Sequence, residues 1–189
     1  YEINISWWSA MADGGIDPAH HQRARFLMTQ LLILALPGVP AFYLPALLAA
    51  PNDLGRFRRT GHRRDLNRPQ FKAEALERRL QDPDSDATAV TTMLARALDV
   101  RKTQAALHPD AALEVLSTGR SDLVVLRRSR HGQVLLAIHN LTPSRLTLAL
   151  GGFVDPVTGP WVDCLNGSTE ALSSLLQLEP YAVHWLIQS

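Results

Sequence analysis

The spacing of apolar residues changes near residue 109, and this change constrains the fold more than any other feature of the sequence. Before it, apolar residues recur mainly at helical spacing, whereas after it they alternate with polar residues in short runs. Helices and half-buried strands require these two periods respectively. The sequence therefore predicts two domains, a mainly helical part at residues 1–108 and a β domain at residues 109–189.

The helical part has the order of elements that is typical of α/β proteins. His21–Leu36 carries apolar residues on every face of its later turns, which indicates a buried helix, and Pro37-Gly38 ends it. Val39–Leu44 is short, apolar and partly β-branched or aromatic, so it predicts a buried parallel strand. Pro45–Pro69 is rich in Arg, Gly and Asn, and a loop of this length is usually functional.

A second helix is predicted at Ala87–Leu107, with Asp86 placed to cap its first turn. The acidic run Asp82–Asp86 also has the spacing of calcium ligands. A calcium loop requires Gly at its sixth and Glu at its twelfth position, where Ala87 and Met93 stand. Helix capping is therefore the favoured role of this run.

Six strand-like runs separated by turn residues follow in the second part. They are residues 113–116, 123–126, 134–138, 146–150, 161–165 and 181–187. Short strands at this spacing predict an antiparallel sandwich.

Composition excludes several classes of protein. The 189 residues are 46% hydrophobic and 20% charged with a net charge of +1, which is typical of a globular protein and gives no bias toward nucleic acid or membranes. Cys164 is the single cysteine, so no internal disulfide can form. The apolar run Leu31–Val39 is too short to span a bilayer. We expect a cytoplasmic protein that binds neither membrane nor nucleic acid.

Several short motifs occur in a fixed order along the chain: Tyr1-Glu2-Ile3-Asn4, Leu36-Pro37-Gly38-Val39-Pro40, Thr60-Gly61, Asn67-Arg68 and Leu178–Leu186. Together they resemble the closing quarter of the α-amylase-type barrel of glycoside hydrolase family 13, and within it the sucrose phosphorylase group. The resemblance implies that residues 1–108 are the end of a (β/α)8 TIM barrel and residues 109–189 an antiparallel β sandwich. The chain begins without Met and inside a loop, so we expect it to be the C-terminal segment of a longer protein.

The resemblance also implies which residues bind substrate. Arg68, preceded by Asn67, matches the arginine that contacts the glucosyl hydroxyls, and a guanidinium offers several fixed donors for that purpose. Tyr1 and Glu2 match the loop that forms the acceptor subsite. A Gln is common at position 2 in sucrose-specific members, so Glu2 favours glucosylglycerate or glucosylglycerol over sucrose.

The implied reaction is the retaining phosphorolysis of an α-glucoside to α-glucose 1-phosphate. The Asp nucleophile, the Glu acid/base and the second Asp of the family lie upstream of the motif at Tyr1, so we assign no catalytic residue here. The chemistry requires no metal and no organic cofactor, only inorganic phosphate as co-substrate. The apolar surfaces of the barrel end predict a protein partner, either the N-terminal barrel segment or a second copy of the chain.

Other interpretations remain open. An α-glucosidase or transglucosylase would share the same motifs, and a non-catalytic carbohydrate-binding protein would share the scaffold. Six arginines between residues 56 and 68 are also compatible with a nucleic-acid surface, which the near-neutral charge disfavours. Trp7 and Trp8 either stack on sugar or pack against the barrel. Cys164 is expected to be a core residue.

Overall fold

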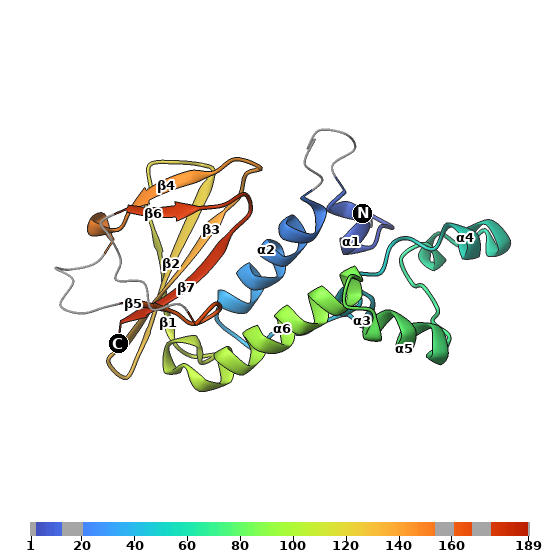
Figure 1. The fold of residues 1–189 in the computed structure, drawn as a ribbon, viewed down its shortest axis with the longest axis horizontal. Coiled ribbons are helices and arrows are strands. Elements are labelled where there is room, and N and C mark those ends of the chain that lie inside the picture. The colour runs from blue at the N-terminus through green and yellow to red at the C-terminus, as the bar shows by residue number, and fades with distance from the viewer. Residues whose placement is uncertain (1–2, 13–20, 154–160, 168–174, 189) are drawn as a thin grey trace. The chain divides into compact units, whose positions relative to one another are not determined.

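The computed structural model describes the 189-residue chain except residues 1–2, 13–20, 154–160, 168–174 and 189 (Figure 1). Contacts divide the chain into two units. Unit 1 comprises Tyr1–Leu27 and Ala41–Ala95, and unit 2 comprises Met28–Pro40 and Arg96–Ser189. The domain boundary near residue 109 stays a prediction. No helix within the described ranges is both long and apolar enough to cross a bilayer.

The two long helices form close to where the apolar periodicity predicts them. The first, α2, runs from Gln22 to Ala35 and ends before Pro37 and Gly38, where Gly38 takes a φ of 90°. This positive φ costs a glycine nothing, so the pair both stops the helix and turns the chain. The second, α6, spans Asp86–Thr103, and a 3-10 turn, η2, continues it at Ala105–Leu107.

The strand predicted at Val39–Leu44 is wrong. Residues 39–43 are irregular, Val39 is 84% and Tyr43 55% exposed, and the helix α3 begins at Leu44. A parallel strand is formed by hydrogen bonds to neighbouring strands, and Pro40 removes one donor. The described part of the chain supplies no strand that pairs with this segment.

Unit 1 contains more helix than the sequence pattern predicts. Its helices are α1 (Trp7–Ala10), α3 (Leu44–Leu47), α4 (Leu54–Thr60), η1 (Arg63–Asp65) and α5 (Ala73–Gln81), together with parts of α2 and α6. Trp8 is buried against Phe26, with ring centroids 5.3 Å apart in an edge-on arrangement, so Trp8 is a packing residue. Trp7 remains 46% exposed.

The residue that caps α6 is Ser85, not Asp86 as the sequence suggested. Its Oγ accepts a hydrogen bond from the Thr88 N–H at 3.0 Å, which is the geometry of an N-cap. Asp86 instead forms an ion pair with Arg23 at 2.7 Å. The preceding Asp82 accepts from the Asp84 N–H within a turn.

Unit 2 is built around two antiparallel sheets. Five strands pair in the order β1-β2-β3-β7-β5, and β4 pairs with β6. The strands are β1 (Ala112–Leu116), β2 (Leu123–Arg130), β3 (Gln133–Asn140), β4 (Leu146–Ala149), β5 (Trp161–Asp163), β6 (Leu175–Leu178) and β7 (Val183–Gln188). All pairs are antiparallel, as the turn spacing predicts. The sequence pattern missed β6.

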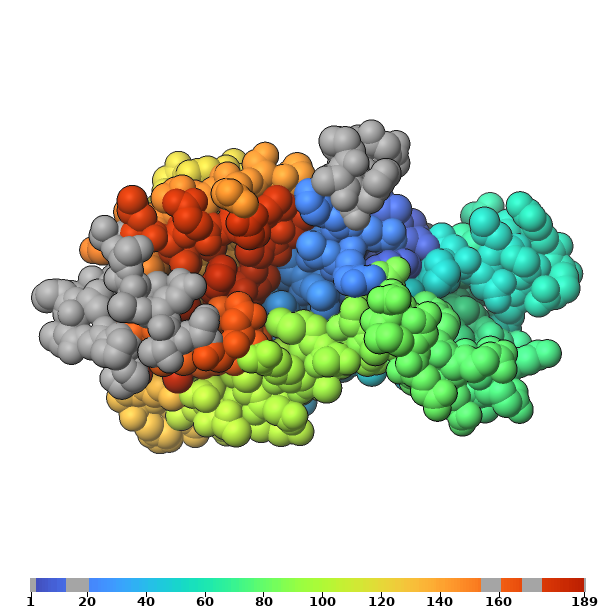
Figure 2. Space-filling model, viewed as in Figure 1, coloured from blue at the N-terminus to red at the C-terminus, as the bar shows by residue number. Residues whose placement is uncertain are grey.

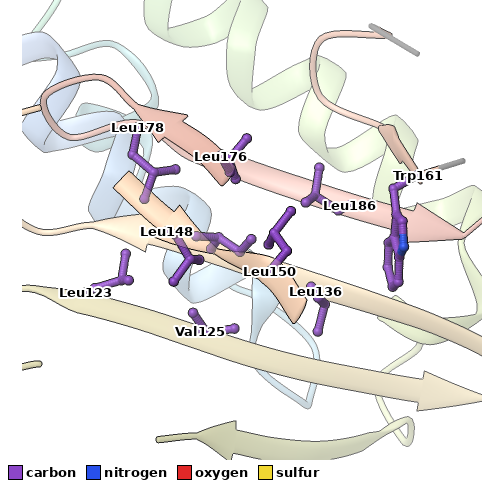
Figure 3. Packing of buried hydrophobic residues seen from close by; sticks show 10 residues of the cluster. Leu123, Val125, Leu136, Leu148, Leu150, Trp161, Leu176, Leu178 and Leu186 are labelled. Atoms are coloured by element: carbon purple, nitrogen blue, oxygen red, sulfur yellow. The ribbon is translucent and has the colours of Figure 1, made fainter. Parts of the chain in front are cut away.

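An apolar cluster fills the space between the two sheets (Figure 3). Its members are Leu123, Val125, Leu136, Ile138, Leu148, Leu150, Trp161, Leu176, Leu178 and Leu186. Side chains two residues apart along a strand share a face, so β2 and β3 contribute alternate residues to this cluster, and β7 contributes Leu186. The other residues of these strands lie on the opposite face of the five-stranded sheet.

That opposite face carries a fully buried arginine, Arg128. Its guanidinium donates to the carbonyl oxygens of Ala35 (2.5 Å), His108 (2.8 Å), Ala111 and Ala112 (both 3.2 Å). Within unit 2 it therefore links the end of α2 to the sheet. Burial lowers the pKa of Arg128, and the nearby charge of Arg101 lowers it further.

Arg101 completes the arrangement at the end of α2. It donates to the carbonyl oxygens of Leu34, Leu36 (3.2 Å) and Gly38 (2.6 Å). The last carbonyls of a helix have no partner within the helix and carry partial negative charge, which a cation stabilises. The two guanidinium groups thus satisfy the C-terminal end of α2.

We expect acid to destabilise unit 2 through His139. Burial, and secondarily the charge of His184, lowers the pKa of His139 to about 3, whereas it is near 6.5 without these effects. Because the unfolded chain binds the proton first, stability is complete above pH 6.5 and is lost as the pH falls toward 3. Between pH 6.5 and 4.5 the loss should be about 2 to 3 kcal/mol.

Denaturant unfolding at a series of pH values measures this loss. His139→Leu should remove most of the slope between pH 6.5 and 4.5, whereas His131→Asn, at an exposed hairpin turn, should leave it unchanged. An equal slope in wild type and His139→Leu would show that His139 is not the responsible group.

Candidate functional site

Of the four predicted substrate-binding residues, the structure describes Asn67 and Arg68. Asn67 and Arg68 follow η1 in unit 1, with Arg68 exposed and Asn67 half-buried. Tyr1 and Glu2 lie outside the described residues. The site is therefore built here around residues 52–68, which we call the Arg68 loop.

The Arg68 loop is held at both ends of its helix α4. Asp53 caps the helix, because its Oδ1 accepts from the Arg56 N–H at 2.7 Å. At the other end Gly61 takes a φ of 69° and its N–H donates to the Phe57 carbonyl. The Asp53 N–H also donates to the Leu66 carbonyl at 2.7 Å, so the start of the loop is bound to its last turn.

Arg56 connects α4 to the predicted substrate-binding motif Asn67-Arg68. Its Nη2 lies 2.9 Å from Asp65 Oδ1, and its Nη1 donates to the carbonyl oxygen of Arg68 at 2.9 Å. A hydrogen bond from the Thr60 hydroxyl, with the charges of Arg56 and His62, lowers the pKa of Asp65. Asp65 is therefore ionised at neutral pH and serves as a fixed partner for Arg56.

The segment that follows Tyr1-Glu2 contacts the start of the Arg68 loop. Asn52 Oδ1 accepts from the Ser6 N–H at 2.7 Å, and the Asn52 N–H donates to Ser9 Oγ at 2.9 Å. Ser6 in turn caps α1. These contacts unite two parts of the chain that the motifs had associated only by their order, and the sequence pattern had assigned no role to Ser6 or Ser9.

Two amide oxygens in this region are buried without a hydrogen-bond partner among the described residues. They are Asn4 Oδ1 and Asn67 Oδ1. A buried acceptor without a donor is costly, so each has the capacity to accept a further hydrogen bond. Asn67, which precedes Arg68 in the chain, thus has an unused acceptor that is buried from solvent.

The site has the chemistry of a binding surface. Asp53 is used as a helix cap and Asp65 as the partner of Arg56, so neither carboxylate is a free nucleophile or acid. Further exposed arginines surround them on α4 and η1, namely Arg58, Arg59, Arg63 and Arg64. In the space-filling view, α4 (cyan) forms part of the exposed surface of unit 1 (Figure 2). The arrangement suits hydroxyl-rich or anionic ligands.

Other candidate groups in the chain do not extend this site. Burial, and then the charge of Asp163, raises the pKa of Cys164 to about 11, so its thiol stays protonated. Cys164 is half-buried and not part of the core, contrary to the expectation from the sequence. A cavity of about 480 Å³ in unit 2 is lined by residues that include Val39, Leu98 and Arg101 and by none of the predicted site residues.

Comparison with known proteins relates the chain to phosphorylases. It is 28% identical over 188 residues to the glucosylglycerate phosphorylase of Allomeiothermus silvanus, covering 99% of this chain and 31% of that protein. It is 32% identical over 129 residues to the glucosylglycerate phosphorylase of Spirochaeta thermophila, and this match covers 68% of this chain and 22% of that protein. It is 25% identical over 132 residues to the sucrose phosphorylase of Streptococcus mutans, and this match covers 70% of this chain and 24% of that protein. No family model matches the chain.

Solved structures show the same fold. The trehalose-6-phosphate hydrolase of Bacillus licheniformis superposes with a TM-score of 0.68 at 14% identity, covering 96% of this chain and 41% of that one. A mutant of trehalulose synthase superposes with a TM-score of 0.68 at 15% identity, and the superposition covers 98% of this chain and 42% of that one. Nearly all of this chain aligns with the glucosylglycerate phosphorylase of Allomeiothermus silvanus, but the chain spans only about a third of the length of that protein.

Proposed function

Because this chain belongs to the α-amylase family, glycoside hydrolase family 13, and is related to its glucosylglycerate and sucrose phosphorylases, we propose that it is the C-terminal part of an α-glucoside phosphorylase. In this proposal residues 1–108 complete a (β/α)8 barrel and residues 109–189 form its C-terminal β domain. The observation that carries the proposal is the similarity to a glucosylglycerate phosphorylase along 99% of the chain.

The proposed reaction transfers a glucosyl group from an α-glucoside to inorganic phosphate. A carboxylate displaces the acceptor to form a covalent glucosyl-enzyme, and phosphate then attacks the same carbon, so α-glucose 1-phosphate forms with retention. We place the carboxylates that do this work in the protein upstream of Tyr1. The residues in this chain bind and orient the sugar.

Arg68 is the central binding residue in this proposal. Its guanidinium donates to hydroxyl groups of the glucosyl ring. Several directed hydrogen bonds to one ring fix its orientation relative to the nucleophile, which lowers the entropic part of the barrier.

A hydrolase or transglucosylase on the same scaffold is the second candidate. The structural similarity to a trehalose-6-phosphate hydrolase and a trehalulose synthase supports this fold but not a particular acceptor. The sequence similarity favours phosphorolysis, because the glucosylglycerate phosphorylase of Allomeiothermus silvanus aligns along nearly the whole chain.

A panel of α-glucoside donors tests the proposed function. The intact enzyme is incubated with phosphate and, separately, sucrose, glucosylglycerate, glucosylglycerol or sucrose 6-phosphate, and glucose 1-phosphate is assayed. We expect release from glucosylglycerate in excess of release from sucrose. No glucose 1-phosphate from any donor would reject phosphorolysis.

We expect Glu2→Gln to change the relative use of acceptors while leaving formation of the glucosyl-enzyme largely intact. The reason is electrostatic, because a carboxylate and a neutral amide differ in their interactions with anionic and neutral acceptors. The measurement is the ratio of initial rates in the synthetic direction, from glucose 1-phosphate with fructose, glycerate, glycerol or fructose 6-phosphate as the acceptor. An unchanged acceptor profile would remove Glu2 from the acceptor subsite.

A further inference from the structure

The substrate-binding arginine is itself held in place by a second arginine. Arg56 Nη1 donates to the carbonyl oxygen of Arg68, while its Nη2 pairs with Asp65, each at 2.9 Å. We propose that Arg56 is a positioning residue, which fixes the backbone of Arg68 so that the Arg68 guanidinium meets the sugar in one orientation. This inference rests on the proposed function of Arg68.

The guanidinium of Arg56 is anchored more firmly than an ordinary surface charge. Only 22% of its side chain and 16% of that of Asp65 are exposed, so solvent screens the pair less than a fully exposed one. Asp65 lies three residues before Arg68 in the chain. Arg56 therefore holds the motif at two points, the carboxylate of Asp65 and the carbonyl of Arg68.

The backbone of Arg56 is fixed as well. Its N–H donates to Asp53 Oδ1 at 2.7 Å, and the Asp53 N–H donates to the Leu66 carbonyl at 2.7 Å. The start of α4 and the turn before Arg68 are thus joined by backbone and side-chain contacts at the same place. A change in the Arg56 side chain would leave these backbone contacts intact while it releases the Arg68 carbonyl and the Asp65 carboxylate.

The geometry requires an arginine. A planar guanidinium presents donors in a rigid fork, so two of its nitrogens reach a carboxylate and a carbonyl at once. A lysine at this position keeps the charge next to Asp65 but cannot hold both groups in the same fixed geometry. Arg56→Lys therefore separates the positioning contact from the ion pair.

The expected effect is a loss of catalytic efficiency without a loss of fold. Because a misplacement of about 1 Å is capable of lowering a rate up to about 100-fold, we expect Arg56→Lys to lower kcat/KM by about tenfold and Arg56→Met by more. Arg78→Met is the matched control, since Arg78 is exposed on α5 outside the Arg68 loop, and it should change kcat/KM less than twofold.

A double-mutant cycle with Arg68→Ala distinguishes positioning from general stabilisation. If Arg56 acts through Arg68, Arg56→Lys has little further effect on kcat/KM in the Arg68→Ala enzyme. An equal loss in both backgrounds would overturn the inference, and so would wild-type efficiency of both Arg56→Lys and Arg56→Met.

Failure of the proposed function is separable from failure of this inference. If the wild-type enzyme releases no glucose 1-phosphate, the function is wrong, and hydrogen exchange of the backbone amides at residues 65–68 decides the inference. Faster exchange in Arg56→Met than in wild type and Arg78→Met supports positioning. Equal exchange in all three overturns it.

Discussion

Replacing Arg68 by Ala in the intact enzyme should lower kcat/KM by at least about 100-fold, which corresponds to about 3 kcal/mol of transition-state stabilisation. The loss arises because, in the proposed function, charge-assisted hydrogen bonds from the guanidinium to sugar hydroxyls disappear. Arg68→Lys should lose nearly as much, because an ammonium group cannot reproduce the fixed fork of donors.

The fold should hardly respond to the change at Arg68. Its side chain is exposed in the structure, and its main-chain carbonyl, which Arg56 contacts, remains in the Ala variant. The melting temperature of Arg68→Ala should thus match that of wild type. Near wild-type kcat/KM in Arg68→Ala would show that Arg68 is a surface residue without a role in the site.

Replacing Arg128 by Met should lower the free energy of unfolding by about 3 to 5 kcal/mol. The guanidinium is fully buried and donates to four carbonyl oxygens, each of which would lose this donor in the variant. One of them belongs to Ala35 at the end of α2, so the contact between this helix end and the sheet would weaken most.

Denaturant unfolding of the 189-residue chain, followed by tryptophan fluorescence, measures this loss. Trp161 and Trp185 are buried in unit 2 and report on its packing. Arg145→Met is the matched control, because Arg145 is 67% exposed in its pair with Glu179 and should cost at most about 1 kcal/mol. A loss for Arg128→Met no larger than for the control would refute the structural role of Arg128.

The sequence pattern predicts the β part well because its strands are amphipathic and bounded by turns. The exception is β6, Leu175–Leu178, a four-residue strand that pairs only with β4 about 30 residues earlier in the chain. So short a run carries little periodicity of its own, and its partner defines it as a strand. The reverse error at Val39–Leu44 has the same cause, since a strand-like sequence formed no strand without a pairing partner.

The sequence allows a candidate site to be proposed, but it does not show how that site is constructed. Asn67 and Arg68 are visible as a motif, and Asn52-Asp53 as a polar pair, in the sequence alone. The contacts from Arg56 to Asp65 and Arg68 depend on the turn at Gly61, which brings residues 12 positions apart together. Six arginines in this region are alike by sequence, and only their tertiary contacts separate Arg56 from the others.

If this chain is the C-terminal part of a retaining α-glucoside phosphorylase, the intact enzyme must release the α-anomer of glucose 1-phosphate. The intact enzyme is incubated with glucosylglycerate and inorganic phosphate, and the products are followed by phosphorus and proton NMR. We expect α-glucose 1-phosphate to appear as glucosylglycerate is consumed, and inorganic phosphate to be depleted in equal amount. Free glucose at undiminished phosphate, or the β-anomer of glucose 1-phosphate, would contradict it.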